Sequence, residues 1–250
     1  MLQINLLLLF VFLQPIPTVK DATVLSSISM EQICGDVIHK SWDTMLKNFV
    51  DDKGNVDYQG FMKESETLNL YLEQLGSNTA NENWSREKKL AYYINFYNAA
   101  TVKLILDNYP LASIKDINKP WDKAWIRYGG ELISLGEIEH KILRKMNEPR
   151  IHFAINCASY SCPKLLNEAY TEGKLDNQLD KATKDFVNDP GRNIISENKV
   201  ELSRIFKWYN KDFENNGSLV VYLNQYLKSS INPDVKIEYL KYNWSLNEIK

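Results

Sequence analysis

Helical patterns outnumber strand patterns along this chain, and the two kinds do not alternate. Apolar residues recur at helical spacing over residues 29–75, with a turn at 51–55, and then over 85–108, 135–143, 175–186 and 219–227. A doubly wound parallel sheet needs regular alternation of strands and helices. We therefore predict an α+β fold, a helix-rich single domain around a small mixed or antiparallel sheet.

The expected strands are few and short. Residues 125–134 form a predicted hairpin, because Gly129 and Gly130 supply the positive φ values of a tight turn. Short strands are expected at 199–203 and 235–239. Residues 150–156 are almost continuously apolar, which favours a central strand covered on both faces, with Phe153 in the core.

Composition and charge exclude several classes of protein. The 250 residues are 44% hydrophobic, and 30 Lys and Arg oppose 32 Asp and Glu, for a formal net charge of -2. These values lie far from those of disordered or collagenous chains. A nucleic-acid partner is not expected, since binding of phosphates usually needs an excess of Lys and Arg.

The N-terminus resembles a targeting segment. Eight apolar residues occupy 6–13, and Pro15 and Pro17 follow. The run is shorter than the roughly 20 residues that cross a bilayer, but it has the length of a signal-peptide core. A buried N-terminal helix is the alternative. We predict a signal peptide over 1–20, a single domain over 21–250, and a secreted or extracytoplasmic (periplasmic or lumenal) protein with no membrane span in the mature chain.

Three cysteines, Cys34, Cys157 and Cys162, are too few for a disulfide scaffold, so a hydrophobic core must hold the fold. The four residues between Cys157 and Cys162 permit a disulfide if a turn brings the Cα atoms within about 7 Å. A free thiol at Cys157 and a structural bridge to Cys162 both remain open.

Several motifs resemble those of the DUF547 family, a domain of unknown function. They are VDY at 56–58, AYYINFYNA at 91–99, SI at 113–114, SLGEIEHKILR at 134–144, PRIHFAINCASYSCP at 149–163 and YNWSLN at 242–247. The resemblance runs from about residue 35 to the end, with core motifs over 85–165 and a helical N-terminal part over 29–80. It implies no activity. Cys34 lies outside these motifs, so we interpret it as the odd cysteine.

The most specific motifs hold a candidate catalytic group. A thiol that follows a strand and precedes a turn can be ionised by free backbone N–H groups and then needs a base. We interpret Cys157 as the nucleophile and His140 as the base. Glu139 or Asn95 would then orient the His140 imidazole. Catalysis then requires Cys157 and His140 to lie roughly 3–4 Å apart.

Four further residues are candidate binding groups: Asn98, Asn156, His152 and Trp244. In an extended strand, His152 would point to the opposite face from Cys157, about 16 Å away, which excludes it as the base unless a bulge intervenes. A zinc site of His140, Cys157 and Cys162 is the weakest interpretation, and no metal or other cofactor is expected.

Two functions from different classes remain. The first is a secreted cysteine-dependent hydrolase that acts on an amide or ester bond in a peptide or a cell-wall-like substrate. The alternative is a non-catalytic binding module, with a structural Cys157–Cys162 disulfide and a groove lined by Asn95, Asn98, Trp84 and Trp244. The partner would be an extracellular peptide, glycan or small molecule.

Overall fold

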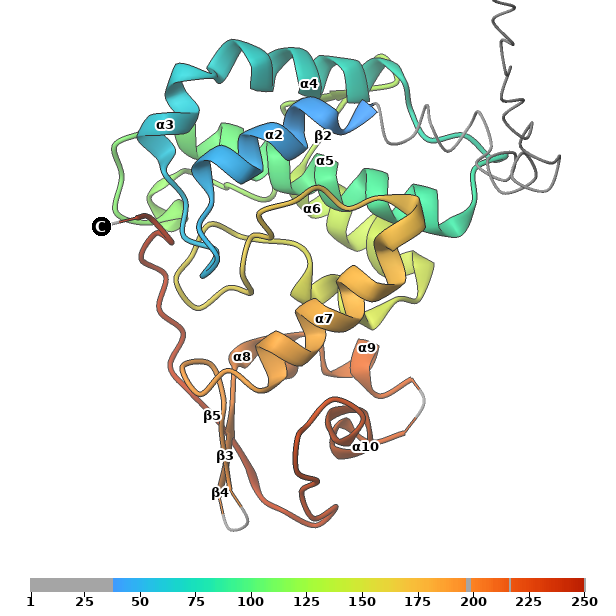
Figure 1. Cartoon of the computed structure of the whole chain (residues 1–250), viewed down its shortest axis with the longest axis vertical. Helices are drawn as coiled ribbons and strands as arrows, with labels where there is room; N and C mark the ends of the chain where they lie inside the picture. Colours follow the sequence, from blue (N-terminus) through green and yellow to red (C-terminus); the bar gives the residue numbers. More distant parts are fainter. Residues whose placement is uncertain (1–37, 197–198, 216, 250) are drawn as a thin grey trace, which may run out of the picture.

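A buried helix, α5 (Arg86–Leu106), runs through the middle of the computed structural model, which describes residues 38–196, 199–215 and 217–249 (Figure 1). Every residue from Leu90 to Val102 is buried. Ser85 begins the helix by accepting a hydrogen bond from the Lys88 amide. A helix that is covered on all sides belongs to a core. The helix-rich α+β prediction is confirmed, with α5 rather than a sheet at the centre.

Three N-terminal helices cover one side of α5: α2 (Lys40–Phe49), α3 (Tyr58–Lys63) and α4 (Ser65–Ser77). Trp42 of α2 stacks on Tyr71 of α4, and the Tyr92 hydroxyl of α5 donates to the Leu75 carbonyl. The predicted turn after α2 is present, with Gly54 at φ 79°. The predicted signal peptide and Cys34 lie outside the described residues.

Both sheets are small and lie away from the centre. The predicted hairpin is confirmed: β1 (Ile126–Tyr128) pairs antiparallel with β2 (Glu131–Ile133), and Gly129 and Gly130 have positive φ. The second sheet has the order β3 (Ile194–Ser196), β4 (Lys199–Leu202), β5 (Ile237–Tyr239). It is mixed, because β3 is antiparallel and β5 parallel to β4.

The helix expected after the hairpin is present as three consecutive segments, each with a different helical geometry. A Ser134–Glu137 capping box begins α6 (Leu135–Glu137), a π-helical turn spans Ile138–Ile142, and a 3₁₀ turn spans Leu143–Met146. Asn147 ends it in the left-handed region, with φ 53°. The π turn carries Glu139 and His140, and such turns are frequent at functional sites.

The strand predicted over 150–156 is wrong. Pro149–Phe153 is a 3₁₀ helix, begun by Glu148, whose side chain accepts from the Arg150 amide, and by Pro149, whose fixed φ suits a helix start. In a short, fully buried apolar run, periodicity alone cannot distinguish a buried helix from a buried strand. Phe153 is buried as expected, although not in a sheet.

The C-terminal part forms a second cluster of buried side chains around Phe153, Phe186, Phe206 and Phe213. Its helices are α7 (Leu175–Val187), α8 (Arg204–Trp208), α9 (Asn210–Phe213) and α10 (Leu219–Asn224). Short 3₁₀ turns lie at Ile114–Asp116 and Glu172–Lys174.

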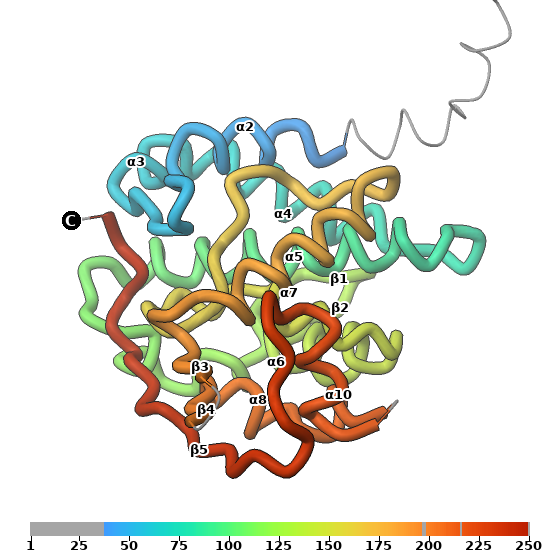
Figure 2. The backbone as a smooth tube through the Cα atoms, turned by 60° about the horizontal axis from the view of Figure 1, so that its bottom comes forward, coloured from blue at the N-terminus to red at the C-terminus, as the bar shows by residue number. Residues whose placement is uncertain are grey.

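The C-terminal tail then returns along the molecule to α3 (Figure 2). It makes β-bridges from Leu246 to Ser159 and from Glu248 to Val56. It therefore fixes the loop that carries Cys157 and Cys162, the cysteine loop, against the N-terminal helices. In the described part of the chain, no helix has the length and hydropathy needed to cross a membrane.

Candidate functional site

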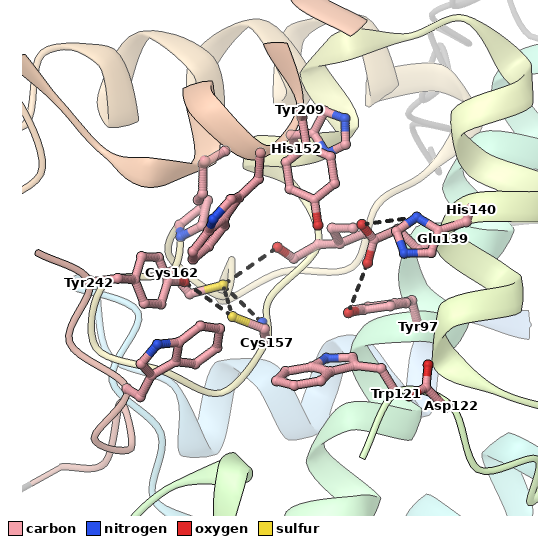
Figure 3. Close-up of a pocket in the computed structure, with 15 residues that line it drawn as sticks. Tyr97, Trp121, Asp122, Glu139, His140, His152, Cys157, Cys162, Tyr209 and Tyr242 are labelled. Carbon is pink, nitrogen blue, oxygen red and sulfur yellow. Dashed lines mark hydrogen bonds and ion pairs between the residues drawn. The ribbon is translucent and has the colours of Figure 1, made fainter. Parts of the chain in front are cut away.

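A pocket of about 360 Å³ brings together residues from both clusters (Figure 3). Its walls come from α5, the π turn, the 3₁₀ helix at Pro149–Phe153, the cysteine loop, α8 and the C-terminal tail. The lining residues are Tyr97, Trp121, Asp122, Glu139, His140, His152, Ile155, Cys157, Cys162, Pro163, Ile205, Trp208, Tyr209, Tyr242 and Trp244.

Buried asparagines hold the loop that carries Cys157. Asn98 of α5 accepts from the Asn156 amide and donates to the Ala154 carbonyl. Asn156 in turn donates to the Pro163 carbonyl and accepts from the Ala158 amide. Ala158 has φ 55°, a conformation that costs an alanine about 1–2 kcal/mol. The network therefore stabilises a strained turn directly after Cys157, and such strain is common at functional sites.

The Cys157 thiol has three hydrogen-bonding neighbours. Its Sγ lies 2.8 Å from Cys162 Sγ, 3.1 Å from Ser159 Oγ and 3.3 Å from Tyr242 Oη. Cys157 is partly exposed to the pocket, whereas Cys162 is buried. Neither cysteine is in a disulfide.

These neighbours favour an ionised sulfur. Each carries a hydrogen that it can donate once Cys157 has lost its own proton. The bond to Cys162, with those to Ser159 and Tyr242, holds the pKa of Cys157 below its ordinary value, although burial acts in the opposite direction. Burial, together with the neighbouring Cys157, raises the pKa of Cys162 well above its ordinary value. Cys157 is therefore the more nucleophilic of the two thiols.

The opposite wall carries Glu139 and His140. Glu139 is only 5% exposed. Its Oε2 accepts from Tyr97 Oη at 3.4 Å, while Oε1 has no hydrogen-bond partner and lies 3.6 Å from His140 Nδ1. His140 is half-exposed, and its Nδ1 also lies 3.3 Å from an Arg144 guanidinium nitrogen. No hydrogen bond joins His140 to Cys157 among the described residues, so the expected contact at 3–4 Å is not formed.

His152 belongs to the same pocket because its segment is a 3₁₀ helix rather than a strand. Its Nε2 lies 2.8 Å from Asp212 Oδ2, and its ring stacks on Tyr209 with centroids 3.9 Å apart. Arg144 donates two further hydrogen bonds to Asp212. Burial lowers the pKa of His152, against the effect of Asp212, so the imidazole is neutral at pH 7. Its buried Nδ1 has no hydrogen-bond partner.

The structure brings together five of the eight residues predicted to form the site: Cys157, His140, Glu139, His152 and Trp244. The other three, Asn95, Asn98 and Asn156, are buried and bind backbone groups. Asn95 bonds both the amide and the carbonyl of Tyr170, so it does not orient His140. Trp84 lies outside the pocket and packs on Tyr92.

Several residues of the site escaped the sequence analysis. Tyr242 lay inside a recognised motif, and Ser159 inside the cysteine motif, but neither residue type indicated a role. Asp212 and Tyr209 lie more than fifty residues from His152, in a part of the sequence for which we predicted no defined element. No periodicity in the sequence could have paired them.

Comparison with known proteins identifies the family of the central segment. Residues 81–187 match the family model "Protein of unknown function, DUF547". The resemblance is confirmed over this DUF547 segment, which holds Glu139, His140, His152 and both pocket cysteines. Asp212, Tyr209 and Tyr242 lie beyond it. No curated protein and no solved structure matches the chain. Within the described residues, no three His, Cys, Asp or Glu side chains are grouped as a metal site would require.

Proposed function

We propose that this protein is an exported, cysteine-dependent enzyme that cleaves an amide or ester bond, with Cys157 as its nucleophile. One observation carries the proposal: a partly exposed sulfur on a pocket wall lies within hydrogen-bonding distance of three groups, each with a hydrogen that it can donate to a thiolate. The thiolate is the reactive form of cysteine, and a lowered pKa supplies it near neutral pH.

The chemistry has two steps. In the first, the Cys157 thiolate attacks the carbonyl carbon, the new C–S bond forms, and the C–N or C–O bond breaks as the leaving group takes a proton from a water molecule in the pocket. In the second, water attacks the thioester, its proton passes to a base, and the thiolate is restored as the leaving group. Because the neighbouring groups favour the thiolate, the base is needed more for the water than for Cys157.

His152 is the better base by its surroundings. Asp212 is a carboxylate acceptor, so Nε2 carries the proton of the neutral imidazole and Nδ1 presents a lone pair. A histidine held by a carboxylate through one nitrogen, with the other free, is the arrangement found in hydrolytic triads. His140, the base inferred from the sequence, is half-exposed and has Arg144 next to its Nδ1.

The binding-module alternative also rests on an observation. The two Sγ atoms are in contact, so an oxidant could join them and remove the nucleophile. An exported protein meets oxidising conditions, which makes the redox state of the pair decisive.

The test begins with the full chain purified without reductant. Iodoacetamide labelling and peptide mapping then locate each free thiol, and p-nitrophenyl esters report acylation. We expect a labelled Cys157, a burst of nitrophenolate with an acyl adduct on its peptide, and loss of both in Cys157→Ala but not in Cys34→Ala. A closed Cys157–Cys162 bridge, or an equal burst from Cys157→Ala, would reject the enzyme.

A further inference from the structure

The fixed charges of the pocket are negative. Asp122 is exposed at the mouth, and Glu139 is buried in the wall. Ionised Cys157 adds a third negative group. None of the described residues that line the pocket is Lys or Arg. The lining itself therefore favours cations over anions, although Lys115 and Arg144 lie over the rings of Trp244 and Tyr209.

Glu139 lacks the partners that a buried carboxylate needs. Its Oε1 has no hydrogen bond and lies 3.6 Å from His140 Nδ1, while the hydroxyls of Tyr97, at 3.4 Å, and Tyr209 face the carboxylate. A buried carboxylate normally accepts several hydrogen bonds or faces a cation. The nearest guanidinium, that of Arg144, is bound to Asp212 through Nε and Nη2, both with short hydrogen bonds. The second unpartnered atom in the pocket, His152 Nδ1, is also an acceptor. The wall thus lacks donors, not acceptors.

Aromatic rings form much of the remaining lining. They belong to Tyr97, Trp121, Trp208, Tyr209, Tyr242 and Trp244. Trp208, Tyr242 and Trp244 pack on one another, and Figure 3 shows Tyr97 beside Glu139, with the Tyr97 hydroxyl directed toward the carboxylate. Ring faces attract cations, and tryptophan does so most strongly.

We propose that the pocket binds the protonated primary amine of its substrate at Glu139. An ammonium group carries three N–H donors and a positive charge, which are the two things that the wall lacks. The substrate is then an amide or ester with an ammonium group elsewhere in the molecule, held so that its carbonyl reaches Cys157. The carbonyl step rests on the proposed function, whereas the ammonium site does not.

The test compares two probes of equal size, benzylamine and benzyl alcohol. The amine is protonated at neutral pH and the alcohol is not charged, and neither contains a bond to cleave. Titration calorimetry on the reduced, full-length protein gives both dissociation constants. We expect benzylamine to bind at least about tenfold more tightly, as one hydrogen bond between charged groups implies.

Variants assign the preference to Glu139. Glu139→Gln should remove it, and Asp122→Asn at the exposed mouth should reduce it only about twofold, as for exposed charges. Glu131→Gln is the matched control, since it removes the same charge from the exposed strand β2, outside the pocket. Circular dichroism checks that each variant is folded. Should Glu139→Gln not fold, equal affinity of the two probes in the wild type would still overturn the proposal, and a preference that Asp122→Asn abolishes would overturn it too.

The outcomes separate the two proposals. Equal affinity for both probes in the wild type, or a preference that survives in Glu139→Gln, would overturn the ammonium site at Glu139. Iodoacetamide reactivity of Cys157, measured in the same samples, reports on the proposed function independently. An unreactive Cys157 together with a Glu139-dependent amine preference would leave a cation-binding pocket without the thiol chemistry.

Discussion

The two walls of the pocket are built in opposite ways. On the thiol wall, Cys157, Ser159 and Tyr242 satisfy one another, and Asn156 fixes the loop beneath them. On the acidic wall, Glu139 Oε1 and His152 Nδ1 are buried without a hydrogen-bond partner. The thiol wall is therefore organised without a ligand, and the acidic wall has the unsatisfied acceptors for which we propose an ammonium ligand. Preorganised donors around a nucleophile and unsatisfied acceptors opposite are what a covalent site for a donor-rich substrate needs.

The largest effect should come from joining the two sulfurs. Treatment with hydrogen peroxide should convert the Cys157 and Cys162 thiols to a disulfide, with two waters formed, because the sulfurs are already in contact. Iodoacetamide labelling of Cys157 should then be almost completely lost and return with dithiothreitol. In Cys162→Ser no bridge can form at this site. A Cys157 that oxidises to sulfinic acid while Cys162 stays free would show that the thiol wall is looser than described.

A large loss of stability is expected from Phe153→Ala. Phe153 is 1% exposed and packs on Phe186, Phe206 and Phe213, next to His152 of the acidic wall. The free energy of unfolding should fall by about 3–5 kcal/mol, as for other buried aromatics. Leu132→Ala, at an exposed position, should change it by less than about 0.5 kcal/mol. Denaturant titration measures both, and similar values for the two would mean that the second cluster is misplaced.

A smaller effect should follow from removing one donor from the thiol wall. Tyr242→Phe deletes a hydrogen bond to Cys157 and should raise the pKa of that thiol. Alkylation near pH 6 should slow about tenfold, the lower end for a hydrogen bond to a charged group. Tyr160→Phe makes the same change at an exposed tyrosine of the same loop. If both variants retain the wild-type rate, Tyr242 does not stabilise the thiolate.

The smallest effect is expected on the acidic wall when only the thiol is probed. His140→Ala should change the alkylation rate of Cys157 by less than about twofold, because no hydrogen bond links them. His152→Asn should likewise spare alkylation but slow the hydrolysis of the acyl-enzyme. Stopped-flow ester hydrolysis separates the burst from the steady state. A slower burst in His140→Ala would restore His140 as the base for Cys157.

The sequence motifs indicated which residues line the pocket more accurately than hydrophobic periodicity predicted the secondary structure around it. Cys157, His140 and Glu139 stood out because the cysteine motif and the Glu-His helix are specific, and both motifs line the pocket. Of the three asparagines, Asn98 and Asn156 hold the segment that carries Cys157, whereas Asn95 binds the backbone of Tyr170. An asparagine that binds backbone and one that faces a ligand look identical in a sequence.

The error over His152 had a physical cause. The mostly apolar stretch 151–155 fits a buried strand and a buried 3₁₀ helix equally well, and the structure has a 3₁₀ helix that begins at Pro149. The strand geometry placed His152 on the wrong face and excluded it. Asp212, which holds it, comes from a segment sixty residues later, so only the tertiary structure could join them.

The central claim is that Cys157 is an activated thiol, and its alkylation rate as a function of pH tests that claim most directly. The reduced, full-length protein is treated with iodoacetamide from about pH 5 to pH 10, and the Cys157 peptide is quantified by mass spectrometry. Because the pKa of Cys157 is lowered, the thiolate is present above the lowered value and is lost only as the pH falls through it. The midpoint should therefore lie clearly below the free-thiol value of about 8.5. A midpoint at or above that value would contradict the account.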